Sequence, residues 1–408
     1  MRNVVTPVRR AAGFSALMLL PLMSGTAAAQ GSTLIPEITI DVSGVYEDNF
    51  ARSSEQLAAQ RGVDPSDFVV TPSIALNFNR TIGRAEVSLT GALGYVFHAR
   101  NTDLNRERIG LTAAAEMPVG PCQIAPNVSI QRRQSDLRDI VFINGLGVNN
   151  AKNTETVQSY GAAIACGRRQ GLQPYVSINH QRASNSNPIR DRAEYDATTY
   201  SGGLRYSSPV VGKVSVFGSR RVVDQSPLAV PVGTETSYRF DQVGVEVQRD
   251  IGTRITATGS VGYGKLSSDS VLVDRFSGLT WDIELSALIG TSLRLTAGTG
   301  REVSNSLASD AGFVVTTPNR VGLAYAFSER LRFQAGAEFT KRRFGYSQLA
   351  VPTRIVEEDR QTYDASISTT LGRRLKLRIY GGHERRNANG TIFDYRANFV
   401  GAAIGLSI

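Results

Sequence analysis

Charged residues alternate with apolar ones in a stretch near the middle of the chain. Asp282 and Glu284 are separated by a single apolar residue, and Arg294 follows after a short break. Successive side chains of a β-strand point to opposite faces, so these three residues would share one face and the apolar residues would occupy the other. If that charged face lined water, it could attract or repel charged solutes.

The same spacing puts further charged residues on the corresponding face of other predicted strands. Rings of basic side chains select anions or phosphate-like groups, and opposed clusters of charge set a transverse field. The alternatives are that these residues are solvated without selectivity, or that acids and bases on neighbouring strands pair with one another. The candidates for the water-lined face are Arg108, Arg254, Arg294, Arg332, Lys376, Arg378, Arg396, Asp282, Glu284, Glu338 and Asp364.

The sequence gives little indication of a catalytic site. The three histidines, His98, His180 and His383, fall near the ends of predicted strands that are not neighbours, so we expect no metal site and no cofactor. His383 and Glu384 lack the second histidine of a zinc-protease motif. A serine from a nearby loop could complete a Ser-His-acid site with them, but we expect no enzymatic activity.

The chain has two cysteines, and their positions predict a disulfide. Cys122 begins the predicted strand 121–134, and Cys166 lies near the end of the next predicted strand, 154–168. Antiparallel neighbours would place the two residues opposite each other, at the end with short connections. An even number of cysteines in an exported chain favours a bond between them over two buried thiols.

The N-terminus has the pattern of a cleaved signal peptide. Three arginines precede the apolar segment 11–23, and small residues before Gln30 provide a cleavage site. The apolar segment is too short for a membrane anchor, which is the alternative. We therefore expect a signal peptide over residues 1–29 and one domain over residues 30–408, with no transmembrane helix.

From residue 36 onward the sequence consists of long segments with a period of two, which predicts β-strands. Short connections with Gly or Pro alternate with long ones rich in Asn, Ser and Asp. The eighteen predicted strands are 36–50, 67–80, 83–99, 106–117, 121–134, 154–168, 171–183, 193–207, 212–223, 236–249, 253–265, 276–289, 292–304, 314–328, 330–345, 359–371, 373–386 and 393–408.

Strand length and connection pattern favour a transmembrane antiparallel up-and-down β-barrel. Soluble strands usually have about 5–6 residues, whereas membrane strands need about 9–11. Short turns on one side and long loops on the other are typical of outer-membrane barrels, and an even strand count allows closure. Aromatic residues near the strand ends would face the membrane interfaces; they are Tyr46, Tyr95, Phe97, Tyr263, Tyr325 and Phe327. A soluble sandwich and a propeller are the rival folds.

The signal peptide, the strands and the alternating connections resemble those of Gram-negative outer-membrane β-barrel porins, most closely the "putative β-barrel porin 2" type. The resemblance implies a location in the bacterial outer membrane. The implied partners are outer-membrane lipid, the barrel assembly machinery and small hydrophilic solutes or polysaccharide, since some relatives are linked with exopolysaccharide loci; nucleic acid is not expected. Such barrels usually end in Phe or Trp, whereas this chain ends GAAIGLSI, which weakens the assembly signal.

The resemblance implies a pore for passive passage of hydrophilic solutes, with anionic solutes and saccharides as candidates, and the charged residues above would line it. The alternative is a structural or interaction barrel whose loops plug the lumen. In the first long loop, Ser53 and Gln56 have capping-box spacing and Gly62 is a plausible stop, which predicts a short helix in or over the lumen. Apolar segments in later loops could form a constriction or extend strands; they are 141–148, 228–232, 271–273, 349–351 and 355–356.

Overall fold

The computed structural model describes residues 36–137, 151–168, 170–225, 237–268, 274–305, 311–345 and 355–408. The predicted signal peptide lies outside these ranges. So do the predicted apolar loop segments, apart from Ile355 and Val356. Within the described ranges, no helix has the length and apolar character required to cross a membrane.

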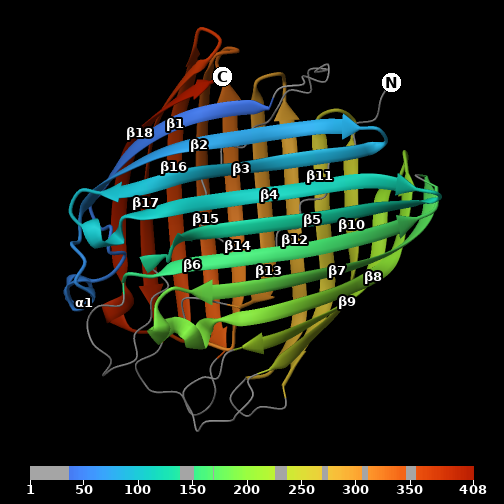
Figure 1. Cartoon of the computed structure of the whole chain (residues 1–408), viewed down its shortest axis with the longest axis horizontal. Coiled ribbons are helices and arrows are strands. Elements are labelled where there is room, and N and C mark those ends of the chain that lie inside the picture. Colours follow the sequence, from blue (N-terminus) through green and yellow to red (C-terminus); the bar gives the residue numbers. More distant parts are fainter. Residues whose placement is uncertain are drawn as a thin grey trace.

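The described chain forms one antiparallel sheet of eighteen strands, as predicted (Figure 1). Each strand pairs with its neighbours in sequence, and the strands have 11 to 16 residues. They are β1 Glu37–Glu47, β2 Asp67–Ile82, β3 Ala85–His98, β4 Arg106–Val119, β5 Cys122–Gln134, β6 Thr154–Cys166, β7 Gly171–Asn185, β8 Tyr195–Ser208, β9 Gly212–Gln225, β10 Tyr238–Ile251, β11 Ile255–Ser267, β12 Phe276–Ile289, β13 Leu293–Ser304, β14 Phe313–Ala326, β15 Leu331–Gly345, β16 Glu357–Leu371, β17 Leu375–Ala388 and β18 Tyr395–Ser407.

The first and last strands close the sheet into a barrel. β1 pairs with β18 from Thr39, opposite Ser407, to Glu47, opposite Phe399. Every strand therefore has two hydrogen-bonded neighbours, and the sheet has no free edge. In Figure 1 the strands of the front wall, β1 to β9, cross those of the back wall steeply, as expected for strands that tilt around a closed barrel.

The two ends of the barrel are built differently. One end, here called the turn end, has tight turns in which glycines adopt positive φ, for example Gly83, Gly290 and Gly372. A residue with a Cβ rarely adopts this conformation, so the sequence requires glycine there. The opposite end, the loop end, carries the long connections. These contain the helix α1 Glu55–Arg61 and the 3-10 helices η1 Thr102–Leu104, η3 Pro188–Ala193 and η4 Thr391–Phe393.

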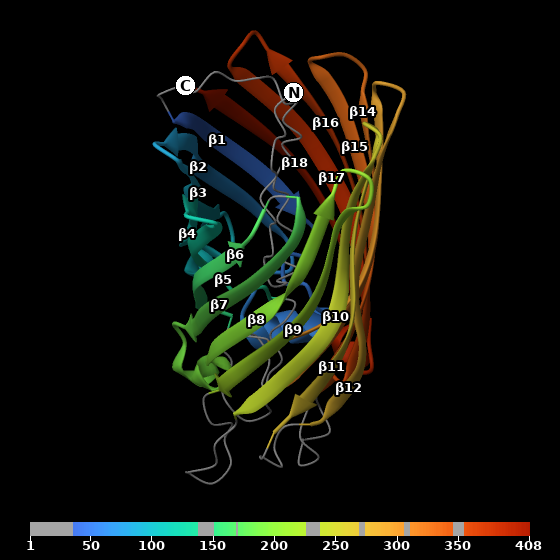
Figure 2. The same ribbon diagram turned by 90° about the vertical axis from the view of Figure 1, so that its right-hand side faces the viewer.

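Helix α1 identifies the inner face of the barrel. Figure 2 shows the helix inside the wall, near the loop end. Leu57 of α1 belongs to one buried cluster with Val314 of β14 and Phe344 of β15. The strand positions that share a face with Val314 and Phe344 therefore point into the lumen, and the alternate positions point outward.

The outward positions are mostly apolar and exposed. Ile283 and Leu285 of β12 point outward, whereas Asp282 and Glu284 between them point inward. All six aromatic residues predicted near the strand ends are exposed, including Phe97 and Phe327. An apolar outer belt with aromatic residues at its rims suits a barrel surrounded by lipid, and it excludes the soluble sandwich, whose apolar side chains would face a common core.

Cys122 and Cys166 form a disulfide at the turn end. They are directly opposite each other in the register of β5 and β6, as the sequence predicted. The bond joins two strands that are already hydrogen-bonded, so its main effect is on the unfolded chain, in which it closes a loop between residues 44 positions apart.

Replacing both cysteines, as Cys122→Ser with Cys166→Ser, should lower the free energy of unfolding by about 2–4 kcal/mol, because the unfolded chain gains conformational entropy. Urea unfolding of the barrel in detergent micelles, followed by tryptophan fluorescence, would measure the change. Reduced wild-type protein should match the double variant. An unchanged unfolding midpoint would show that the bond contributes nothing to stability.

Candidate functional site

The inner face of the turn-end half carries charged side chains that are exposed. Asp282 and Glu284 of β12, Arg294 of β13 and Arg332 of β15 each lie at an inward position and are exposed. Arg108 of β4 is also exposed and inward, opposite Gly94 of β3, but it lies near the loop end and not in the turn-end half. A side chain inside a closed barrel can be exposed only if the lumen there is open to water. The turn-end half of the lumen is therefore hydrated.

Three arginines form a row on this inner face, here called the basic row: Arg294, Arg332 and Arg378. Arg332 and Arg378 lie on β15 and β17 at the same level, with Ser368 of β16 between them. Arg294, on β13, is level with Gln334 of β15, which is two residues from Arg332 toward the loop end. With strands about 4.8 Å apart, the basic row covers about 19 Å of the circumference.

Arg294 and Arg332 form no ion pair within the described part of the chain. Residues Asp282 and Glu284 do not neutralise Arg294, because the residue opposite Arg294 is Leu288 and the two acids face glycines on β13. Arg378 is more constrained than its neighbours. Its Nη2 donates to Ser366 Oγ at 3.2 Å, and its guanidinium carbon lies 5.4 Å from the centroid of the Tyr380 ring.

The remaining inward candidates lie on the same strands as the basic row or beside them, and one of them, Glu338, forms ion pairs. Lys376 lies on β17, two residues from Arg378 toward the turn end, and Asp364 lies on β16 opposite Gly336 and Gly382. Glu338 contacts two arginines, Arg320 at 3.3 Å and Arg360 at 3.4 Å. Glu338 therefore serves as a local counter-ion within the wall.

Two of the predicted residues do not line the inner wall. Arg396 is at an outward position of β18, because its neighbours Tyr395 and Ala397 are the buried, inward residues. The prediction for Arg396 was wrong because Arg396 is an even number of residues from Val400 and Ile404, which are exposed on the outer face, and it therefore shares their face. Arg254 precedes β11 and lies in the turn between β10 and β11, so it is at the turn-end rim.

The loop-end half of the inner wall is occupied by helix α1. Ser54 caps the helix by accepting a hydrogen bond from Leu57 N, and Gly62 ends it in the left-handed conformation. The sequence placed the cap one residue earlier, at Ser53, and predicted the stop at Gly62 correctly. Ser54 Oγ also donates to the Ile392 carbonyl in the connection between β17 and β18.

Helix α1 packs into two buried clusters, one on each side. On one side, Leu57 packs with Val314 and Phe344 on β14 and β15. On the other side, Ala58 packs with Leu104 after β3 and Leu137 after β5. In an eighteen-stranded closed barrel, β5 and β14 are nine strands apart in either direction, so they lie on opposite walls. The helix thus lies between the wall at β14 and β15 and the connections that follow β3 and β5.

Buried ion pairs fix α1 to the wall. Arg52, just before the helix, contacts Glu384 of β17 at 3.1 Å and Glu47 of β1 at 2.9 Å. Tyr395 of β18 donates a hydrogen bond to Glu384, whose side chain is 2% exposed. Burial lowers the pKa of Arg61, at the end of the helix, to about 9, with a further contribution from nearby arginines.

A second buried network lies beside the first, on β15, β16 and β17. Glu358 contacts Arg342 at 3.3 Å and also contacts Arg386. All three side chains are at least nine-tenths buried. None of these three residues was predicted from the sequence to be functional. The alternation along the strands indicates that these side chains point inward, but it does not indicate that a loop buries them.

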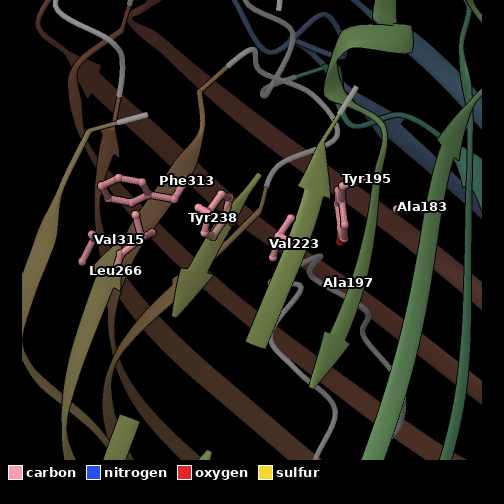
Figure 3. Close-up of a cluster of buried hydrophobic side chains, with 8 residues drawn as sticks. All are labelled: Ala183, Tyr195, Ala197, Val223, Tyr238, Leu266, Phe313 and Val315. Atoms are coloured by element: carbon pink, nitrogen blue, oxygen red, sulfur yellow. The ribbon is translucent and has the colours of Figure 1, made fainter. Parts of the chain in front are cut away.

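The opposite sector of the loop-end half is apolar. Eight buried side chains near the loop ends of β7 to β11 and of β14 form one cluster (Figure 3). They are Ala183, Tyr195, Ala197, Val223, Tyr238, Leu266, Phe313 and Val315. The loop end is therefore packed on several sides, in contrast to the exposed charges of the turn end.

The histidines do not form a catalytic or metal-binding group. Glu384 points inward, whereas His383 is at an outward position and contacts Asn398 at 2.8 Å, so the two cannot share a site. His98 is buried against Asp67 at 3.1 Å. His180 contacts Thr198 on the outer face. Among the described residues, no group of His, Cys, Asp and Glu is arranged to hold a metal ion.

Residues 33–407 match the protein family described as putative beta-barrel porin 2. The chain belongs to this family. The family and the closed eighteen-stranded barrel place the porin in the bacterial outer membrane, with the turn end in the periplasm and the loop end outside the cell. A comparison with curated proteins gives no match.

Several solved structures, among them a BenF-like porin, have a fold similar to that of this chain. OccK2 (OpdF) of Pseudomonas aeruginosa is 12% identical, with a TM-score of 0.48, over 93% of this chain and 100% of that one. A BenF-like porin from Pseudomonas fluorescens Pf-5 has the same identity and coverage and a TM-score of 0.47. OccAB3 of Acinetobacter baumannii is 10% identical, with a TM-score of 0.46, over 91% and 99% of the two chains. At these identities the similarity concerns the fold alone.

The substitution Glu384→Ala should loosen α1 and raise the single-channel conductance of the porin in planar bilayers. Removing one partner of a buried ion pair costs about 3 kcal/mol or more, and the second contact of Arg52, with Glu47, keeps the loss near that lower value.

A suitable control is Glu357→Ala, since Glu357 lies on the outer face of β16 and pairs with Arg343 there. This control should leave the conductance unchanged. If correctly folded Glu384→Ala protein conducts like the wild type, α1 does not limit the flow of ions.

Proposed function

We propose that this porin is a passive pore for small hydrophilic solutes, with a preference for anions. The observation that carries the proposal is the exposure of inward-facing charged residues, Asp282, Glu284, Arg294 and Arg332, in the periplasmic half of the lumen. Exposed charges on an inner wall need a hydrated passage, and a hydrated passage across a membrane permits diffusion of polar molecules.

The preference for anions rests on the basic row. Arg294 and Arg332 extend into the lumen without an ion-pair partner in the described ranges, so their fields act on the passing solute. The acids Asp282 and Glu284 lie on β12, nearer the loop end than Arg294. Glu284 is about four residues away, or about 14 Å, and Asp282 is about six residues away, or about 20 Å. Acids and bases on adjacent parts of one wall produce a lateral field across the passage.

Helix α1 favours small solutes over a polysaccharide. The helix lies in the loop-end half of the barrel and is fixed by buried contacts of Leu57, Ala58 and Arg52. A polymer would have to displace it, and displacement would expose these contacts to water. A function in exopolysaccharide export would therefore require a second state of the loop end in which α1 leaves the wall.

The second candidate is an interaction barrel that does not transport. The same contacts of α1, together with the apolar cluster of β7 to β14, favour it, because both fill the loop end. Planar-bilayer recordings of purified protein separate the two functions. Stable, anion-biased conductance supports the pore, and absence of conductance in a correctly folded barrel supports the interaction barrel.

Replacing the basic row, as Arg294→Ser with Arg332→Ser and Arg378→Ser, should shift the ion selectivity toward cations. A unit charge at about 4 Å is worth about 1 kcal/mol in water, so we expect the anion-to-cation permeability ratio to fall by about fivefold. Reversal potentials in a salt gradient measure this ratio.

The matched control removes the same charge from the outer face, as Arg182→Ser with Arg239→Ser and Lys265→Ser. These three positions point outward on β7, β10 and β11. The control should keep the wild-type selectivity. Equal reversal potentials for the basic-row variant and the wild type would refute the role of the basic row while leaving the pore itself intact.

A further inference from the structure

Two arginines on the outer face oppose each other across β17 and β18. Arg385 and Arg396 are direct partners in the register of these strands, and both are at outward positions. Directly opposite side chains in an antiparallel pair have Cβ atoms about 4.5–5.5 Å apart, and like charges there are destabilising. The barrel therefore holds two guanidinium groups together on its outer surface.

Neither arginine has an acidic partner within the described residues. The contact that the structure shows is from Arg385 Nε to the Asn387 side-chain oxygen at 3.2 Å. Other outward bases at the loop end do have acidic partners. Arg220 contacts Asp241 and Arg132 contacts Glu107, both at 2.7 Å.

No other directly opposed pair of bases occurs on the outer face in the described register. Arg182 is opposite Asp196, and Lys265 is opposite Asp241. These two bases are therefore directly opposed to acids, whereas Arg385 and Arg396 repel each other. An external anion could relieve this repulsion.

The position of the pair relative to the hydrocarbon belt indicates the kind of anion. On β18 the last exposed apolar residue below the pair is Val400, and Asn398 follows. On the neighbouring β16, Tyr363 forms an edge contact with Phe339 of β15, as aromatic residues do at a membrane interface. Arg396 is two residues beyond Asn398, or about 7 Å. The two guanidinium groups thus lie just above the apolar belt, at the level of lipid headgroups.

We propose that Arg385 and Arg396 form a binding site for the phosphate groups of the phosphorylated glycolipid in the outer leaflet. Arginine binds phosphate in a bidentate manner, and two guanidinium groups about one strand spacing apart can share one phosphate. The acyl chains of such a lipid would lie against Val400 and the apolar belt below. Basic clusters next to a membrane bind anionic headgroups by the same physics.

The test uses the full barrel in detergent and synthetic lipid A with both phosphates as the probe, with binding measured by native mass spectrometry. The double variant Arg385→Ser with Arg396→Ser should bind this lipid at least about tenfold more weakly than the wild type, because the charge-assisted contacts are lost. The wild type should also bind the dephosphorylated lipid weakly. Thermal unfolding should show a rise in midpoint with phosphorylated lipid A for the wild type and a smaller rise for the double variant.

The control variant Arg220→Ser with Arg239→Ser removes two outward charges from β9 and β10 and should bind the lipid as the wild type does. The double variant should fold, since it loses a repulsion, and its heat-dependent mobility on gels verifies this. Undiminished binding by the folded double variant overturns the proposal. Equal binding of dephosphorylated lipid also overturns it, because the acyl chains alone would then account for the interaction.

Discussion

The constraint on which the rest of the structure depends is that every backbone N–H and C=O in lipid must have a hydrogen-bond partner inside the protein. The pairing of β1 with β18 meets this constraint for the two strands that would otherwise be edges. Once the sheet is closed, alternation assigns each side chain to lipid or to lumen. The inward charges of β12 to β17 and the outward aromatic residues follow from that single choice of closure and register.

The sequence was sufficient to predict this part of the fold. Long strands with a period of two, separated by turns in which glycines adopt positive φ, carry a repeated local signal, and eighteen repetitions make the count robust. The pairing of Cys122 with Cys166 follows from the same register. Arg396 was misassigned because an error of one residue in parity reverses the face. Arg254 was misassigned because strand ends are the least regular part of the pattern.

The loop end could not be predicted in the same way. Parity shows that Glu358, Glu384 and Arg386 point inward, but it does not show that a helix from the first loop covers them. Their burial depends on contacts between the connection that follows β1 and strands β15 to β18, which are more than 250 residues away in sequence. Local patterns contain no information about such contacts. The helix itself was predictable, because the cap and the stop at Gly62 are local.

The contacts of α1 also have a consequence for the order of assembly. The helix follows the first strand, yet its partners Phe344, Glu384 and Phe393 belong to the last quarter of the chain. During folding the contacts of α1 with Leu104 and Leu137 can form early, but those with β14 to β17 cannot form until these strands are in place, and the entropy of closing so long a loop delays them further. The narrowing of the mouth is therefore a late event. A nascent barrel would be leakier than the mature one, and docking of α1 marks the end of maturation.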